Sequence, residues 1–481
     1  MKHLSRLVAT SVVALTGAVF AQTQPKTMPD RPNSGEIPLP VIHTSMKPMP
    51  GVDQLPSRPG MPDVLVMDNG QPVKTPKQWQ QRREEIKRTL EYYAVGQAPP
   101  PPGNVKGHEV SSQLLADGKV RYRLVHLTFG PKESLSLDIG IFTPATGRPV
   151  PAVISPSGTP PGATSLTRLP QGANQGKGQD ALLVTGPMAV PETREPPPGA
   201  REGETPTPRR GPFGPRTAEE IATTNPAITH GFAFVTFNNN DCGEDTTLRL
   251  PDGSWAYRTT RFYPAYPNYD WGLLQAWAWG VSRIVDYLET DPTIDKTKLI
   301  VTGVSRTGKS ALIAGAFDDR IAMTAPVASS GGGTPAYRFS GAGRGGKEGL
   351  SEMVQKYPNW FSPHLHEFWG QQDKLPFDEH WFIALVAARP FISLEGTRDQ
   401  NVNINGVYQS FLAVKPVYAF LHAEDRLGIS FADRPHGMVQ GDWDAMLAFA
   451  DKFLLGKSVT RSFEEFPPEL LKVPAQEEDV H

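Results

Sequence analysis

The sequence predicts an α/β fold in which helices cover both faces of a mostly parallel sheet. From residue 231 onward, short apolar runs of strand length alternate with longer segments of helical periodicity, a pattern typical of parallel sheets. One of these runs leads into the turn VTGVSRTGKS, residues 301–310, which a helical segment follows. The chain has 481 residues and one cysteine, Cys242, so its core must be large enough to fold without an internal disulfide.

The expected elements follow from periodicity along the chain. Residues 76–93 predict a helix, because Trp79, Ile86, Leu90 and Tyr93 fall on one helical face. The alternating segments 119–126 and 135–141 are typical of antiparallel edge strands. Further strands are expected at 150–154, 231–237, 299–301, 322–328, 390–394 and 417–421, and further helices at 271–288, 310–317, 378–387 and 443–454.

The amino-terminal residues have the pattern of a secretory signal. A positive segment at 1–6, an apolar stretch at 7–20 and the small-residue site before Gln22 predict a signal peptide over 1–21. The apolar stretch is shorter than the ~20 residues that cross a bilayer. We therefore expect a secreted or periplasmic bacterial protein. The remaining boundaries are a Pro/Gly-rich extension at 22–75, a catalytic domain at 76–460 with a Pro/Gly/Arg-rich surface insertion at about 156–215, and a tail at 461–481.

The charge of the chain excludes some partners. A net charge of −2 gives no electrostatic footprint for nucleic acid or for an anionic membrane. No Cys, His and carboxylate cluster with ligand spacing indicates a metal, and we expect no cofactor. The expected form is a monomer that acts on a neutral or weakly charged substrate.

The turn at 301–310 fits two different motifs. Residues 303–310, GVSRTGKS, match the phosphate-binding pattern G-x-x-x-x-G-K-[ST]. The same residues fit a nucleophile turn that lifts the hydroxyl of Ser305 above a sheet. The phosphate-loop interpretation also needs a strand that ends in a magnesium-binding acid, and the best strand, 231–237, runs into three asparagines before Asp241. An exported protein also meets little nucleotide, so the nucleophile turn is favoured.

A serine nucleophile needs a histidine base and an acid that orients the histidine. In the α/β-hydrolase fold these residues occur in the order Ser, acid, His, each beyond the carboxyl end of a strand. Ser305, Asp399 and His436 fill these places. The sequence therefore predicts an α/β-hydrolase fold, a three-layer sandwich with a mostly parallel central sheet, although a chain with 11 histidines can also place one in a surface loop here by chance.

The acid is the least certain member of this set. Glu395, Glu424 and Asp425 compete with Asp399, since all lie near or after the last expected strands. Glu395 falls at the very end of a strand, where its side chain is expected to face the sheet edge. Asp399 lies far enough into the loop to reach His436, and Glu424 and Asp425 follow the next expected strand.

Several separate motifs in one order resemble the glucuronoyl esterases, a carbohydrate esterase family of the α/β-hydrolase superfamily, and the resemblance to its bacterial members covers about residues 80–455. The motifs are GVSRTGK at 303–309, WGLLQAWAWGVSRIVDYL at 271–288, YPNWF at 357–361, LPFDEH at 375–380, AARP at 387–390 and GDW at 441–443. The resemblance implies hydrolysis of esters on the carboxyl group of (4-O-methyl-)glucuronic acid, such as lignin–carbohydrate ester links on glucuronoxylan.

The resemblance also implies roles for residues around Ser305. Arg306 would supply its backbone amide, and its guanidinium, to the oxyanion, and Lys309 would bind hydroxyls of the sugar. The alternative for both is a solvated charge pair at a helix start. Gln355 resembles a glutamine that contacts sugar, with an exposed helix residue as the equal alternative.

This sequence departs from the family pattern at two positions. Where many members have a glutamate as the acid, the matching stretch SSGGG at 329–333 has Ser329. Other members have an aspartate in a stretch to which residues 399–403 correspond, so the resemblance selects Asp399. The tryptophan of that stretch is Asn401 here, and an apolar wall expected near the methoxy group of the sugar is lost. Two alternatives therefore stay open: an esterase for another carbohydrate acyl group, or a carbohydrate-binding protein on a hydrolase scaffold.

Overall fold

The structure is a computed structural model, and it describes residues 46–163, 216–245, 261–340, 348–357 and 359–472. Within these ranges nine strands form one sheet in the order β1-β2-β3-β5-β4-β6-β7-β8-β9. The first three strands and β5 pair antiparallel, and every pair from β5 to β9 is parallel. The carboxyl ends of the parallel strands therefore meet along one edge of the sheet.

The strands are β1 (Lys106–Leu115), β2 (Val120–Phe129), β3 (Leu135–Pro144), β4 (Val150–Pro156), β5 (Ala233–Phe237), β6 (Ile294–Val304), β7 (Met323–Val327), β8 (Phe391–Gly396) and β9 (Leu427–Ala432). The α-helices are α1 (Pro76–Leu90), α2 (Ala218–Thr224), α3 (Pro226–Thr229), α4 (Leu273–Leu288), α5 (Arg306–Phe317), α6 (Leu350–Lys356), α7 (His380–Val386), α8 (Ile404–Phe420) and α9 (Gln440–Leu454).

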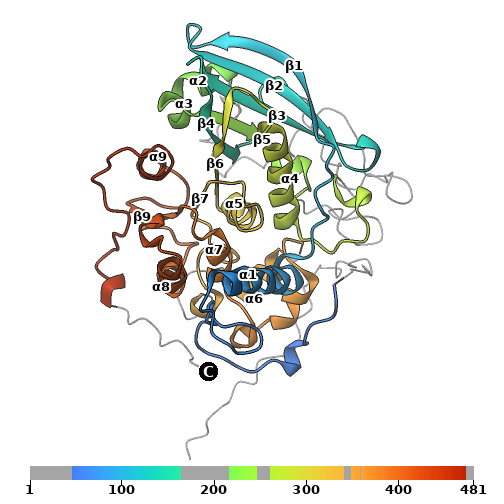
Figure 1. Ribbon diagram of the computed structural model, residues 1–481, viewed down its shortest axis with the longest axis vertical. Coiled ribbons are helices and arrows are strands. Elements are labelled where there is room, and N and C mark those ends of the chain that lie inside the picture. Colours follow the sequence, from blue (N-terminus) through green and yellow to red (C-terminus); the bar gives the residue numbers. More distant parts are fainter. Residues whose placement is uncertain (1–45, 164–215, 246–260, 341–347, 358, 473–481) are drawn as a thin grey trace, which may run out of the picture.

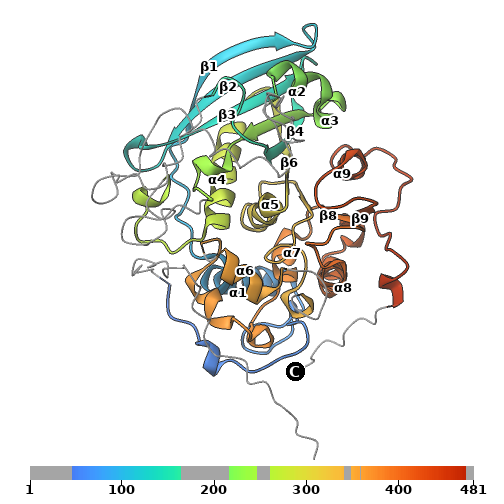
Figure 2. The same ribbon diagram turned by 180° about the vertical axis from the view of Figure 1, so that it is seen from behind.

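Helices cover both faces of the sheet, as Figures 1 and 2 show. Helices α4 and α5 pack on one face, and α7, followed by α1, extends the helical layer on the side of α5. Helix α9 packs on the other face against β7, β8 and β9, next to α3. The three-layer α/β sandwich expected from the sequence is thus confirmed. Its central strands are buried on both sides, as the fully buried β5 and β7 illustrate.

The antiparallel end of the sheet differs from the expectation in two ways. Strands β2 and β3 are antiparallel as expected, but they lie inside the sheet, because an unexpected strand, β1, forms its end. The segment KGHEVSSQLL has no alternation of apolar and polar residues that would predict a strand, and all its residues except Leu115 are exposed. Backbone pairing with β2, including a register shift between Glu109 and Ser111, defines this strand.

The strand expected at 417–421 was wrong, because these residues form the end of α8. The helix begins after Asn403, whose side chain accepts hydrogen bonds from the backbone N–H groups of Asn405 and Gly406. A short apolar run does not distinguish a buried strand from a buried helix, and Gly406 and Pro416 interrupt the helical pattern. The strand that precedes His436 is β9, Leu427–Ala432.

Only some of the expected domain boundaries fall within the described residues. Residues 1–45 and 164–215, which hold the expected signal peptide and most of the expected insertion, lie outside the described residues. Residues 46–75 pack against the domain, where the backbone N–H of Arg58 bonds to the carbonyl of Asp373 at 2.7 Å. At the other end, the carbonyl of Phe463 accepts a 2.7 Å hydrogen bond from Ile429 in β9, so the first residues of the expected tail join the domain.

Candidate active site

The turn between β6 and α5 has the geometry of a nucleophile elbow. Ser305 has φ 59° and ψ −122°, a conformation that a residue other than glycine rarely adopts and that costs on the order of 1–3 kcal/mol. The chain approaches itself closely here, since a Cβ on Gly303 would lie 2.5 Å from the carbonyl oxygen of Thr307. A Cβ on Gly308 would lie 2.9 Å from the carbonyl oxygen of Gly303. Both glycines are therefore required by the turn itself.

The same turn is unsuited to a phosphate. The backbone N–H of Val304 donates to Thr307 Oγ1 at 2.9 Å, and that of Ser305 donates to the carbonyl of Val327 at 2.9 Å. Two of the amides that would cradle a phosphate are thus already satisfied inside the protein. The match to the phosphate-binding pattern is a consequence of the glycines that the elbow needs.

The expected acid and the expected base lie in contact after strands β8 and β9. Asp399 follows β8, His436 follows β9, and Asp399 Oδ2 lies 2.8 Å from His436 Nδ1. Burial raises the pKa of Asp399, but hydrogen bonds from His436 and from the backbone N–H groups of Asn401 and Val402 outweigh it and hold the pKa below its ordinary value. Asp399 is therefore ionised at neutral pH, where it accepts the Nδ1 proton and leaves Nε2 of His436 free to accept another.

These residues lie on one edge of the sheet. Strands β6, β7, β8 and β9 are consecutive and parallel, so Ser305, Asp399 and His436 all follow the carboxyl ends of neighbouring strands. We call this border, with the loops after these four strands, the carboxyl edge. Ligand and catalytic sites of open α/β sheets occur at this edge.

Among the described residues, the three other candidates for the acid, Glu395, Glu424 and Asp425, form no hydrogen bond or ion pair with His436. Glu424 and Asp425 precede β9 and so lie near the opposite edge of the sheet, where both are exposed. Their expected position depended on the strand wrongly expected at 417–421. Glu395 is fully buried near the end of β8, where Oε1 accepts hydrogen bonds from Ser393 Oγ at 2.6 Å and Thr334 Oγ1 at 3.0 Å. Its side chain belongs to the interior of the sheet layer.

Ser329, at the family's glutamate position, joins the same interior network. Its Oγ lies 2.9 Å from Thr334 Oγ1 and accepts the backbone N–H of Thr334 at 3.0 Å. Thr334 thus connects Ser329 with Glu395. Burial raises the pKa of Glu395 to about 7, although hydrogen bonds from Ser393 and Thr334 and the charge of Arg434 oppose this rise.

Arg306 lies over a small aromatic platform. Its guanidinium carbon is 5.2 Å from the ring centre of Trp360 and 5.9 Å from that of Tyr357, and these two rings stack with centroids 3.9 Å apart. Arg306 Nη1 also pairs with Asp245 Oδ2, while Asp245 Oδ1 accepts a 2.9 Å hydrogen bond from Trp360 Nε1. As the first residue of α5, Arg306 has a backbone N–H without an intrahelical acceptor.

Asp245 is a site residue that the sequence interpretation did not identify. It belongs to the polar run NNNDCGED, which follows β5 at the carboxyl ends of the parallel strands. In the sequence this run has the place of a magnesium-binding segment for the phosphate-loop interpretation. Its position directly after a fully buried strand was the signal that could have indicated a site residue.

Lys309 is not a solvated residue. Its side chain is 1% exposed, Nζ donates to Ser330 Oγ at 2.7 Å, and Glu348 Oε2 lies 3.8 Å away. Burial lowers the pKa of Lys309 to about 8, and the charge of Glu348 limits the decrease. The other expected sugar-binding residue, Gln355, is half-buried on α6.

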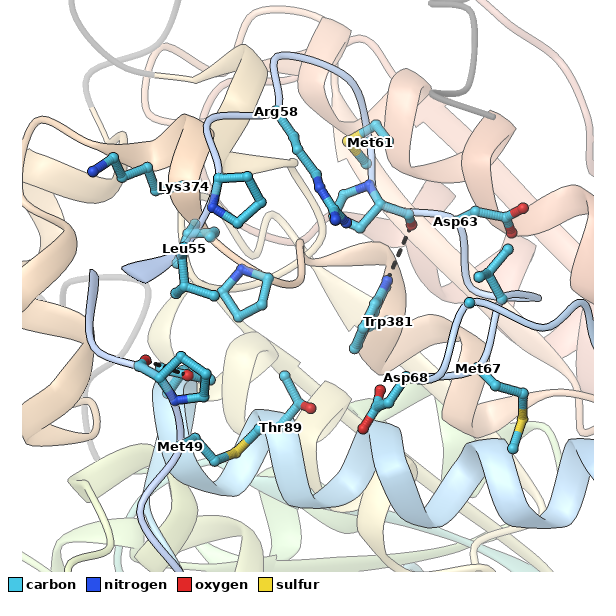
Figure 3. Close-up of a pocket in the computed structure, with 18 of the residues that line it drawn as sticks. Met49, Leu55, Arg58, Met61, Asp63, Met67, Asp68, Thr89, Lys374 and Trp381 are labelled. Carbon is cyan, nitrogen blue, oxygen red and sulfur yellow. Dashed lines mark hydrogen bonds between the residues drawn. The ribbon is translucent and has the colours of Figure 1, made fainter. Parts of the chain in front are cut away.

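A separate cavity of about 400 Å³ lies between the segment 49–70, helix α1 and residues 374–381 (Figure 3). Its lining is largely apolar, with Met49, Met61 and Trp381 among its residues. None of the expected site residues lines this cavity, and the carboxyl edge remains the candidate active site. Within the described part of the chain, no three His, Cys, Asp or Glu residues are grouped to hold a metal, and no helix is long and apolar enough for a membrane span.

Comparison with known proteins finds similarity to the glucuronoyl esterases. A family model described as "Glucuronyl esterase, fungi" matches residues 205–422, which include Ser305 and Asp399. Carbohydrate esterase MZ0003, from an unknown prokaryotic organism, is 28% identical over 82% of this chain and 90% of its own length. A 4-O-methyl-glucuronoyl methylesterase from Phanerochaete carnosa is 27% identical, over 84% of this chain and 83% of its own.

Solved structures agree with the sequence comparisons. A carbohydrate esterase family 15 glucuronoyl esterase from Caldicellulosiruptor kristjansonii superposes with a TM-score of 0.60 at 27% identity, covering 86% of this chain and 97% of that one. A promiscuous family 15 esterase from a marine bacterial metagenome gives a TM-score of 0.62 at 25% identity, covering 84% and 98%. In both sequence and fold the chain is thus similar to the glucuronoyl esterases, the family that its sequence motifs resemble.

Proposed function

We propose that this protein hydrolyses esters of (4-O-methyl-)glucuronic acid through an acyl-enzyme formed on Ser305. Similarity to this family supports a carboxylic ester hydrolase, and relatives carry the name 4-O-methyl-glucuronoyl methylesterase. The observation that carries the proposal is the 2.8 Å hydrogen bond between His436 and Asp399, which lie on the same sheet edge as the strained Ser305.

The proposed reaction needs no group beyond these side chains and water. Ser305 Oγ attacks the ester carbonyl while His436 Nε2 accepts its proton, and Asp399 stabilises the imidazolium that forms. The alkoxy group leaves with the proton from His436. Water then attacks the acyl-enzyme, gives its proton to His436, and releases glucuronate and free Ser305.

Arg306 is proposed to stabilise the oxyanion. Its backbone N–H is unsatisfied within α5, and donors of this kind are worth about 10²–10³ in kcat at other acyl-transfer sites. Its guanidinium adds positive charge beside the nucleophile, and the contacts with Asp245 and Trp360 limit its motion. The preorganised charge then needs little rearrangement during the reaction.

Lys309 and Gln355 remain the proposed sugar contacts. An ammonium group has three donors, and one of those on Lys309 is used by Ser330. A sugar hydroxyl could accept another if it reached past Ser330 and Glu348. Glucuronoxylan and lignin–carbohydrate esters are the proposed natural substrates, on which the protein would act after export as a monomer.

A second candidate is an esterase with a wider acyl range. Asn401 stands where the family pattern has a tryptophan, and its backbone N–H donates to Asp399 Oδ1 at 2.9 Å, which places this position beside the proposed acid. An apolar wall near the methoxy group would therefore be missing. The metagenomic relative of similar fold is itself described as promiscuous.

The test compares hydrolysis of methyl 4-O-methyl-glucuronate with that of an aryl acetate, in wild type and Ser305→Ala. We expect faster hydrolysis of the glucuronate ester and loss of both activities in Ser305→Ala. Ser134→Ala, at an exposed serine before β3, is the matched control and should keep full activity. Equal rates on both esters would favour the wider acyl range, and sugar binding without turnover would favour a carbohydrate-binding protein.

A further inference from the structure

The loop that carries His436 has little hydrophobic anchorage. Among residues 431–440, all of which the structure describes, Arg434 is the only one that is buried, and the others are exposed or half-buried. His436 itself is followed by Gly437, whose φ is 141°. A base on such a loop needs another element to hold its position, because catalytic geometry tolerates only small displacements.

Helix α9 holds the loop, because Arg434 forms an ion pair with Asp442 in the first turn of this helix. Arg434 Nε lies 2.7 Å from Asp442 Oδ2, and Nη2 lies 3.2 Å from Oδ1, so the pair is bidentate. The two side chains are 2% and 1% exposed. Asp442 Oδ2 also accepts the backbone N–H of Val439 at 2.8 Å, which fixes the end of the loop to the helix.

The same arginine reaches the strand and loop that carry the proposed acid. Arg434 Nη2 donates to the carbonyl of Leu394 in β8 at 3.1 Å, and the Arg434 carbonyl accepts the N–H of Arg398 at 3.1 Å. Arg398 directly precedes Asp399. The backbone of Arg434 lies very close to the end of β8, since a Cβ on Gly396 would be 2.6 Å from the Arg434 carbonyl oxygen.

We propose that the buried Arg434–Asp442 pair positions His436 against Asp399 for the reaction proposed above, on which this inference rests. Neither residue touches the reacting atoms in this scheme. Through these hydrogen bonds the pair connects β8 and α9 with the loop that carries Asp399 and the loop that carries His436. It thereby sets the relative position of the two loops. A buried ion pair often adds little net stability compared with apolar side chains, and a positioning role accounts for its presence here.

The primary test is Asp442→Asn. The amide keeps the shape of the side chain but removes the charge that balances the buried Arg434. If the loop shifts by about 1 Å, kcat should fall by about 10²-fold. KM should stay near the wild-type value, because no sugar contact is assigned to either residue.

The chain offers a matched control that joins the same two loops at the surface. Arg398 Nε pairs with Asp433 Oδ1 at 2.6 Å, and these side chains are 62% and 81% exposed. Asp433→Asn should leave kcat and KM unchanged, since exposed pairs contribute little. If Asp433→Asn lowered kcat as much as Asp442→Asn, the proposal would be overturned.

A double variant separates positioning from stability. Arg434→Met with Asp442→Leu replaces the ion pair by apolar side chains, which should recover unfolding stability but not the bonds to Leu394 and Val439. We expect kcat to stay low in the double variant. Recovery of wild-type kcat together with stability would show that the pair only stabilises the fold.

A spectroscopic measurement tests the geometry without turnover. The proton between His436 Nδ1 and Asp399 should give a low-field ¹H NMR signal, assigned by its loss in His436→Gln. In Asp442→Asn and in the double variant this signal should weaken or exchange rapidly, whereas Asp433→Asn should retain it. An unchanged signal in Asp442→Asn would overturn the inference. Loss of the signal would support it even if wild type failed to hydrolyse the glucuronate ester, a result that would refute the proposed function alone.

Discussion

The exchange Glu395→Gln should stabilise the protein at alkaline pH and leave its activity intact. Glu395 is fully buried, and its Oε2 has no hydrogen-bond partner among the described residues. A glutamine has the same shape, and its Oε1 can still accept from Ser393 and Thr334. The exchange therefore removes the possibility of a buried charge with little change in packing.

The magnitude follows from the pKa of this carboxyl. Burial raises it from 4.5 to about 7, and each pKa unit corresponds to about 1.4 kcal/mol. Below pH 4.5 the carboxyl is protonated in both folded and unfolded protein. Between pH 4.5 and 7 only the unfolded chain loses the proton, so stability falls as pH rises. Above pH 7 both states are ionised, and the full penalty of about 3 kcal/mol is present.

The assay is urea unfolding of wild type and Glu395→Gln at pH 5 and pH 8. The variant should gain about 3 kcal/mol at pH 8 and much less at pH 5. Glu424→Gln, at an exposed glutamate, is the matched control and should change stability at neither pH. An equal gain at both pH values, or a loss at pH 8, would refute a buried carboxyl with a raised pKa.

Exchanges at Ser305, Asp399 and Lys309, with two control exchanges, test the proposed site. Ser305→Ala should lower kcat by about 10⁶-fold, measured by steady-state kinetics, while circular dichroism shows that the protein still folds. Retention of most activity would mean that another residue is the nucleophile. Asp399→Asn should lower kcat by up to ~10⁴-fold with little change in KM, because an amide can favour the wrong imidazole tautomer. Glu395→Gln and Asp425→Asn should stay near wild type, and a collapse in either would mean that the acid was misassigned. Lys309→Ala should slow glucuronoyl esters more than aryl acetates if the ammonium binds sugar, whereas equal losses would indicate a structural role.

The sequence predicted the parts of the site that a local pattern determines. The glycines at 303 and 308 follow from the elbow, and the order of Ser305, Asp399 and His436 follows from the places where strands end. The sequence did not predict the contacts that residues distant along the chain make with other side chains of the site. Lys309 is buried because Ser330 and Glu348 converge on it, and Arg306 contacts Asp245 and Trp360 from other loops.

The errors in the fold have a similar origin. The polar strand β1 exists because β2 offers hydrogen-bonding groups, not because its own side chains alternate. Residues 417–421 are apolar enough for a strand, but they continue a helix that begins at Ile404. The competing candidates Glu424 and Asp425 were placed after that strand, so one wrong element gave two carboxylates the wrong position.

The register shift in β1 has a consequence for solubility. Within the described residues β1 pairs on one side only, with β2, so its outer backbone groups could pair with a strand of another molecule. Val110, which is 55% exposed, lies at the shift between Glu109 and Ser111. A bulge bends and twists the strand locally, and Lys106 and Glu109 place charges along the same border. Straightening β1 by deleting Val110 would flatten this border and should make the protein prone to edge-to-edge aggregation.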